Sequence, residues 1–124
     1  MLPYRDPFLP QPRRLADLLS QLTLMEKLAQ LTCHWRWVPS LIGPGGSMVD
    51  EGAQRLLGQG LGILSRLREG LDTGPSAAAA NAVQRWILDH SRLGITVLFH
   101  GEGLHGDMDQ GGTHFPRPLA MASR

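Results

Sequence analysis

Two short apolar runs on either side of a helical segment constrain the fold of this chain more than any other feature. The first run is residues 61–67, "LGILSRL", and the second is residues 95–99, "ITVLF". Neither run alternates apolar with polar residues, and each begins directly after a glycine. Runs of this kind are typical of strands that are buried on both faces. Residues 75–92 between them have the helical period. The order strand, helix, strand predicts a βαβ unit and therefore a parallel sheet.

Apolar residues at helical spacing predict further helices and their buried faces. The 75–92 helix should bury one face, made of Ala79, Val83, Trp86, Ile87 and His90. Leucines at 15, 18, 19 and 22 predict a helix over 13–22, and residues 50–59 predict a short helix closed by Gly60. Thr23 and Glu26 have the spacing of a capping box. They predict another helix, with Leu24, Leu28 and Leu31 as its buried stripe.

Composition excludes several classes of function. The 124 residues suit one domain, and a net charge of +1 argues against a nucleic-acid or membrane surface. The N-terminus has no apolar signal region, and no apolar run reaches membrane-spanning length, so we expect a cytoplasmic location.

Cys33 is the only cysteine. It cannot form an intrachain disulfide, and we expect it to be a buried small hydrophobe.

The segment "FHGEGLHGDMDQGGTHFP", residues 99–116, is the first candidate for a functional site. It contains one Glu, two Asp and three His among five glycines, directly after the predicted strand 95–99. The carboxyl end of a parallel strand is where α/β proteins build their sites. Three interpretations compete for this loop, namely a metal cage, a sugar-binding rim and a solvated turn.

The spacing of ligand-type residues does not favour a metal. His100 and His105 are five residues apart, whereas a zincin helix needs a spacing of four, and the glycines between them oppose a helix. An EF-hand loop starting at Asp107 would end on Pro118 instead of the required Glu. We therefore expect neither a metal nor a cofactor. Asp107 and Asp109 are interpreted as turn residues.

Glu102 lies three residues beyond the predicted strand, where its carboxylate could accept hydrogen bonds from vicinal sugar hydroxyls. Trp35 and Trp37 are more typical of packing, although their rings could also stack on a sugar.

Five blocks of sequence, in order, resemble the N-terminal domain of glycoside hydrolase family 3. They are "YRDP", "DLLSQLTLMEKLAQL", "GLGILSRL", "NAVQRWILDHSRLGITVLFHGEGLHG" and "GGTHFPRPLAMAS", and together they span residues 4–123. The resemblance implies an incomplete (β/α)8 TIM barrel, with N-terminal helices and the first two barrel strands in 14–124 after an extended proline-rich arm, 1–13. It also implies a retaining, exo-acting enzyme that removes terminal β-linked glucose or xylose from oligosaccharides or glycosides.

The resemblance also suggests roles for individual residues. Glu102, in the family's E/D-x-x-H-G segment, would bind hydroxyls of the non-reducing-end sugar. His105 and Phe115 would shape the loop, and His100 would lie near the pocket. Many relatives have a second acidic residue where this chain has Gly101.

No Asp or Glu of this chain matches the family's nucleophile or acid/base residue, which both lie on later segments. Retaining hydrolysis needs two carboxyl groups about 5 Å apart. We therefore expect no catalytic residue in this chain and no hydrolysis by the chain alone.

The alternative is a non-enzymatic sugar-binding or interaction module that uses the same segment. Two barrel strands alone would leave a sheet edge and apolar faces uncovered. Such a module would have to cover them by self-association through the exposed barrel edge or by pairing with another chain.

Overall fold

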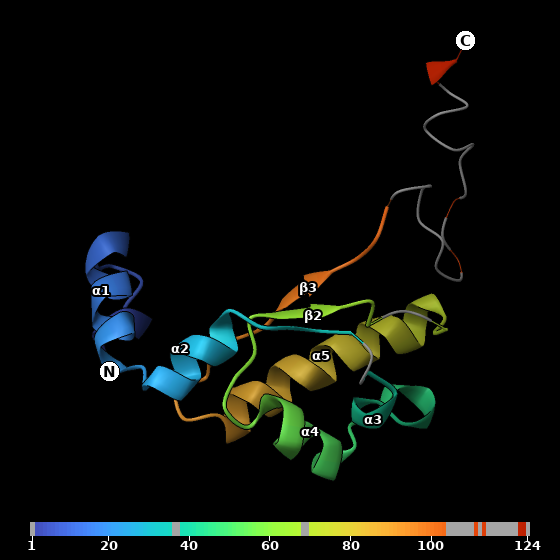
Figure 1. Cartoon of the computed structure of the whole chain (residues 1–124), viewed down its shortest axis with the longest axis horizontal. Coiled ribbons are helices and arrows are strands. Elements are labelled where there is room, and N and C mark those ends of the chain that lie inside the picture. The colour runs from blue at the N-terminus through green and yellow to red at the C-terminus, as the bar shows by residue number, and fades with distance from the viewer. Residues whose placement is uncertain are drawn as a thin grey trace.

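The structure is a computed structural model that describes residues 2–35, 38–67 and 70–103, together with residues 111, 113, 122 and 123. It is a mixed α/β arrangement in which a small parallel sheet packs on helices (Figure 1). The elements in chain order are η1 (Pro3–Arg5), α1 (Gln11–Gln21), α2 (Leu24–Gln30), β1 (Cys33–His34), α3 (Val38–Leu41), η2 (Pro44–Gly46), α4 (Asp50–Leu57), β2 (Ile63–Ser65), α5 (Thr73–His90) and β3 (Leu98–His100).

The predicted βαβ unit is confirmed. Strands β2 and β3 pair in parallel, with Ile63 opposite Leu98 and Ser65 opposite His100. Helix α5 connects them and runs beside both strands (Figure 1). Strand β3 begins three residues later than the apolar run suggests. The reason is that the Gln84 side chain pairs with both backbone groups of Val97, accepting from N at 3.2 Å and donating to O at 2.8 Å.

The sheet contains a third strand, which the sequence did not predict. Strand β1 is two residues long and pairs in parallel with β2, so β2 is the central strand of the described sheet. The backbone at Gly62, just before β2, lies close to the backbone at the end of α2. A Cβ on Gly62 would be 2.0 Å from the backbone oxygen of Gln30. The described residues thus form an open three-stranded sheet. The expectation of two strands is corrected to three.

Helix α5 contributes four residues to the core on one side of the sheet. Ala79, Val83 and Ile87 are completely buried, and Trp86 is nearly so. Their neighbours in one apolar cluster include Leu41 of α3, Leu57 of α4, Leu64 of β2, and Val97. The expected inward position of His90 is wrong. Its ring is exposed and stacks on Trp86 with the centroids 4.6 Å apart.

The capping box of α2 is confirmed, but its expected buried stripe is wrong. Thr23 Oγ1 accepts from the Glu26 amide, and Glu26 Oε2 accepts from the Thr23 amide. Leu24, Leu28 and Leu31 are 72%, 49% and 84% exposed. Helix α2 turns Glu26 inward instead, because this carboxylate pairs with an arginine from the segment before β3.

The N-terminal segment is not simply extended. It contains the 3-10 turn η1, and α1 begins at Gln11. Tyr4 packs with Leu22 and Leu93 in a second small cluster. Leu15 and Leu19 of α1 remain about half exposed, so only part of the predicted apolar face is buried.

The second face of the sheet is not covered by the described residues. Ile63 and Leu98, which lie opposite each other, are 38% and 65% exposed. The expectation of strands buried on both faces is therefore wrong for this part of the chain. The α-helices that the structure describes are all too short or too polar to cross a bilayer.

Candidate functional site

The candidate site lies on the open face, at the carboxyl ends of the three strands. Residues that pair across a parallel ladder share a face, and every second residue along a strand returns to that face. Cys33, Ile63 and Leu98 form one level on this face, and Ser65 and His100 form the next level. The chain therefore brings side chains from segments 30 or more residues apart to one edge.

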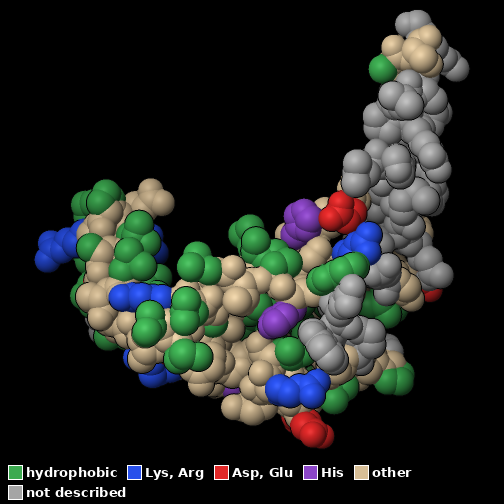
Figure 2. Space-filling model, viewed as in Figure 1, with side chains coloured by type: hydrophobic (Ala, Val, Ile, Leu, Met, Phe, Trp, Pro, Cys, Tyr) green, Lys and Arg blue, Asp and Glu red, His purple; other side chains and the backbone are tan. Residues whose placement is uncertain are grey.

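An open hollow of about 340 Å³ lies at this edge. It is lined by Cys33, Trp35, Ser65, Arg66, His100 and Glu102. Figure 2 shows acidic, basic and histidine side chains gathered together on this face, beside hydrophobic ones. A hollow that combines hydrogen-bonding groups with an aromatic ring is suited to a ligand that is both polar and apolar.

His100 is oriented by the neighbouring strand. Its Nδ1 lies 3.0 Å from the hydroxyl oxygen of Ser65, which is itself buried. Its backbone oxygen accepts a hydrogen bond of 2.9 Å from the amide of Arg66. These contacts fix the imidazole ring at the end of β3. The hydroxyl determines which ring nitrogen is left for a ligand.

Arg66 follows β2 and has an unusual backbone. Its φ of 57° lies in the left-handed region, which L side chains rarely adopt. The guanidinium carbon lies 5.1 Å from the centroid of the Trp35 ring, a cation–π distance. Arg66 and Trp35 thus form one wall of the hollow.

Glu102 and His100, both predicted from the sequence, line the same hollow. Glu102 is exposed, so its carboxylate is accessible to a ligand. Two further predicted residues, His105 and Phe115, lie outside the described residues, as do Asp107 and Asp109. The described residues contain no group of three or more His, Cys, Asp or Glu side chains suited to a metal ion.

The sequence analysis missed part of this site. Cys33 is exposed and lines the hollow, so the expectation of a buried cysteine is wrong. Ser65 and Arg66 were not identified, although they lie near the carboxyl end of the first apolar run, as the 99–116 loop lies at the carboxyl end of the second. Applying the same rule about carboxyl ends to both runs would have found them.

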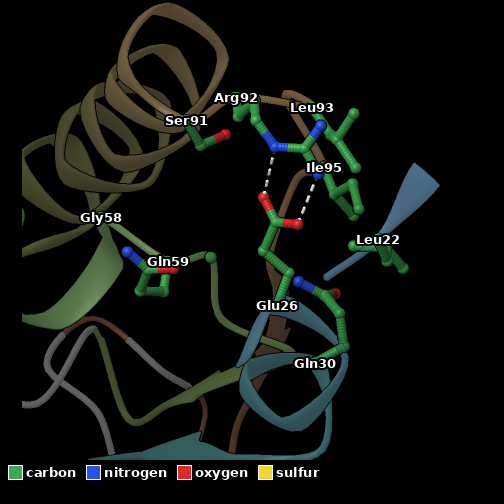
Figure 3. Close-up of a pocket in the computed structure, with 10 residues that line it drawn as sticks. Leu22, Glu26, Gln30, Gly58, Gln59, Ser91, Arg92, Leu93 and Ile95 are labelled. Carbon is green, nitrogen blue, oxygen red and sulfur yellow. Dashed lines mark hydrogen bonds and ion pairs between the residues drawn. The ribbon is translucent and has the colours of Figure 1, made fainter. Parts of the chain in front are cut away.

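A second pocket lies between α2 and the segment before β3 (Figure 3). Glu26 and Arg92 point toward each other within it and form an ion pair. Its volume of about 10 Å³ suits a single water molecule. The ion pair in this pocket connects α2 to the segment before β3. The larger hollow is therefore the candidate site.

These features define a class: an α/β domain with a polar, partly aromatic hollow at the carboxyl ends of parallel strands. No family model matches the chain. The chain is 29% identical over 121 residues to a protein of Formosa agariphila that is named "Putative beta-xylosidase". The alignment covers 97% of this chain but 16% of that protein. The chain is thus similar, along nearly all its length, to a small part of a much longer protein.

Proposed function

We propose that this chain is the N-terminal portion of a retaining, exo-acting glycoside hydrolase of family 3 that removes terminal β-linked glucose or xylose. In this proposal the hollow forms part of the subsite for the non-reducing-end sugar. One observation carries it: Glu102 and Trp35 line the same hollow at the carboxyl ends of parallel strands. The similarity to a protein named a beta-xylosidase supports the same class of substrate.

The side chains in the hollow match the surface of a sugar. A carboxylate such as Glu102 accepts charge-assisted hydrogen bonds from hydroxyls. An aromatic ring such as Trp35 offers an apolar face to the C–H groups of a pyranose. His100, held by Ser65, adds a further polar group at the end of β3.

Hydrolysis requires more carboxyl groups than the described residues of the hollow supply. A retaining glycosidase needs a nucleophile and an acid/base residue, whose carboxyl groups are about 5 Å apart. Glu102 is the single carboxylate among the described residues that line the hollow. We therefore propose that the chain alone binds sugars without hydrolysing them, and that the catalytic pair belongs to a longer protein.

Titration of the ¹⁵N-labelled chain with xylobiose and cellobiose, followed by NMR, tests the proposal. Signals of Trp35 and His100 should shift in a saturable way, whereas the α-linked disaccharide maltose should leave them unchanged. An aryl β-xyloside incubated with the same sample should release no product. Equal shifts with maltose, or no shift with any sugar, would contradict the proposed function.

The second candidate is a sugar-binding module without enzymatic activity. The observation that favours it is that Glu102 is the single carboxylate among the described residues that line the hollow. Activity and binding assays on a longer protein that contains this chain distinguish the two candidate functions. Hydrolysis of aryl β-xylosides or β-glucosides by that protein supports the hydrolase, and saturable binding without turnover supports the module.

A further inference from the structure

Arg66 occupies a backbone position that its side chain disfavours. Among the described residues it is the one non-glycine residue with a positive φ, at 57°. Glycine adopts this conformation without strain, whereas a side chain on Cβ is crowded by the backbone. Strained residues of this kind concentrate at binding and catalytic sites, where the surrounding structure holds them in place.

Arg66 contacts residues at the carboxyl ends of both strands that neighbour β2. The backbone amide of Arg66, directly after β2, donates to the oxygen of His100, the last residue of β3. The guanidinium lies over one face of the ring of Trp35, the residue directly after β1. Because φ sets the direction of a side chain relative to its own amide, this torsion accompanies an arrangement in which the amide faces one neighbouring strand and the side chain lies near the end of the other.

We propose that Arg66 is a ligand-binding residue of the hollow, and this inference rests on the proposed function. A guanidinium offers only donors, and the carboxylate of Glu102 offers only acceptors. Both line the same hollow. A sugar hydroxyl both donates and accepts, so a neutral sugar satisfies both walls at once. A uronic acid would pair with Arg66 but would place a second negative charge near Glu102. The structure therefore assigns the hollow to neutral sugars.

Arg66→Gly tests the proposal, because it removes the guanidinium while suiting the backbone. Binding of xylobiose, measured by NMR titration, should weaken roughly tenfold or more, which is the usual loss for a hydrogen bond to a charged group. The urea midpoint should stay the same or rise, since glycine relieves the strain. Arg66→Asn, which also tolerates this conformation, should lose binding in the same way. Arg66→Lys should bind weakly as well, because an ammonium group lacks the planar fork.

Arg85→Ala is the matched control. Arg85 is exposed on α5, and its loss removes the same charge without touching the hollow. Binding by this variant should equal that of the unsubstituted chain.

Three results would overturn the proposal while leaving the proposed function intact. They are unchanged xylobiose binding by Arg66→Gly, a lowered urea midpoint for Arg66→Gly, and tighter binding of methyl glucuronide than of methyl xyloside by the unsubstituted chain. Failure of the unsubstituted chain to bind any sugar would instead overturn the proposed function, and this inference with it.

Discussion

Arg92 donates two hydrogen bonds to the carboxylate of Glu26, which lies 66 residues earlier in the sequence. Its Nε donates to Oε1 at 2.9 Å, and its Nη2 donates to Oε2 at 2.5 Å (Figure 3). Arg92 also donates to the backbone oxygen of Gln21, and Glu26 caps α2 through Thr23. The pair therefore joins the end of α1 and the start of α2 to the segment that leads into β3.

This pair should make the stability of the chain depend on acid. The hydrogen bonds from Arg92, assisted by Thr23 and opposed by burial, lower the pKa of Glu26 from 4.5 to about 2. A lowered pKa contributes stability that is complete above pH 4.5 and is lost as the pH falls toward about 2. Glu26→Gln should lower the free energy of unfolding by about 1–2 kcal/mol at pH 7. Urea denaturation of both chains from pH 7 to pH 2 measures the difference, which should shrink below pH 4.5.

Asp89→Asn is the control for this experiment. Asp89 is an exposed carboxylate in the last turn of α5. Its substitution should change the free energy of unfolding by less than about 0.5 kcal/mol. A Glu26→Gln chain that loses the same stability at pH 2.5 as at pH 7 would show that the ion pair is not the cause.

Tyr4 should stabilise the fold through its hydroxyl as well as its ring. The hydroxyl donates to the Leu93 oxygen at 2.6 Å and accepts from Arg5 Nε at 2.9 Å. Tyr4→Phe should cost about 1 kcal/mol, because a buried pair of hydrogen bonds is lost while the ring is kept. Phe8→Leu, at a ring that is 93% exposed on the same segment, should have little effect. Urea midpoints at one pH measure both, and equal midpoints for the two variants would contradict the role of the hydroxyl.

Gly62 should tolerate alanine less well than Gly74 does. A Cβ on Gly62 would lie 2.0 Å from the Gln30 oxygen, so β2 and α2 would have to separate. Gly62→Ala should therefore destabilise the chain by about 1–3 kcal/mol. A Cβ on Gly74, in the first turn of α5, meets no atom within 4 Å apart from its chain neighbours. The ring of the following Pro75 disfavours a Cβ on a helical residue, which offsets the gain from replacing glycine, so alanine there should change the stability by less than about 1 kcal/mol. Thermal unfolding of both variants tests the pair, and a stable Gly62→Ala chain would mean that the two elements are not in close contact.

Glu102 should matter most in a longer, active protein that carries this chain. Glu102→Ala should reduce kcat/KM for an aryl glycoside by about one to four powers of ten, because one or two charge-assisted hydrogen bonds to the sugar are lost. Glu102→Gln keeps the shape and one acceptor, so its kcat/KM should lie between those of Glu102→Ala and the unsubstituted protein. Asp107→Ala and Asp109→Ala, at positions interpreted from the sequence as turn residues, should cost less than about tenfold. Steady-state kinetics of all four variants would identify a wrong assignment if Asp107→Ala were inactive and Glu102→Ala were not.

Sequence patterns within a few residues predicted the features that are formed by contacts between sequence neighbours. The capping box needs only Thr23 and Glu26, three residues apart, and its geometry follows from the start of any helix. The periodicity of 75–92 predicted the buried face of α5 except for His90, because the apolar residues of a helix turn toward a core. Glu102 and His100 line the hollow because they follow a strand of a parallel sheet, and their role in a site stays a prediction.

Long-range partners decided the rest. Strand β1 is too short to have a pattern of its own and exists because β2 pairs with it. Glu26 is turned inward, and Leu24 outward, because the Glu26 carboxylate pairs with Arg92. Arg92 lies 66 residues further along the chain, where no local pattern includes it. The left-handed backbone of Arg66 is held between His100 and Trp35, which no local propensity predicts. The sequence by itself thus determined helices α1, α2, α4 and α5 and the βαβ order, since these depend on residues a few places apart. Only the tertiary structure decided which faces are covered and which side chains share the hollow, because those depend on contacts between distant segments.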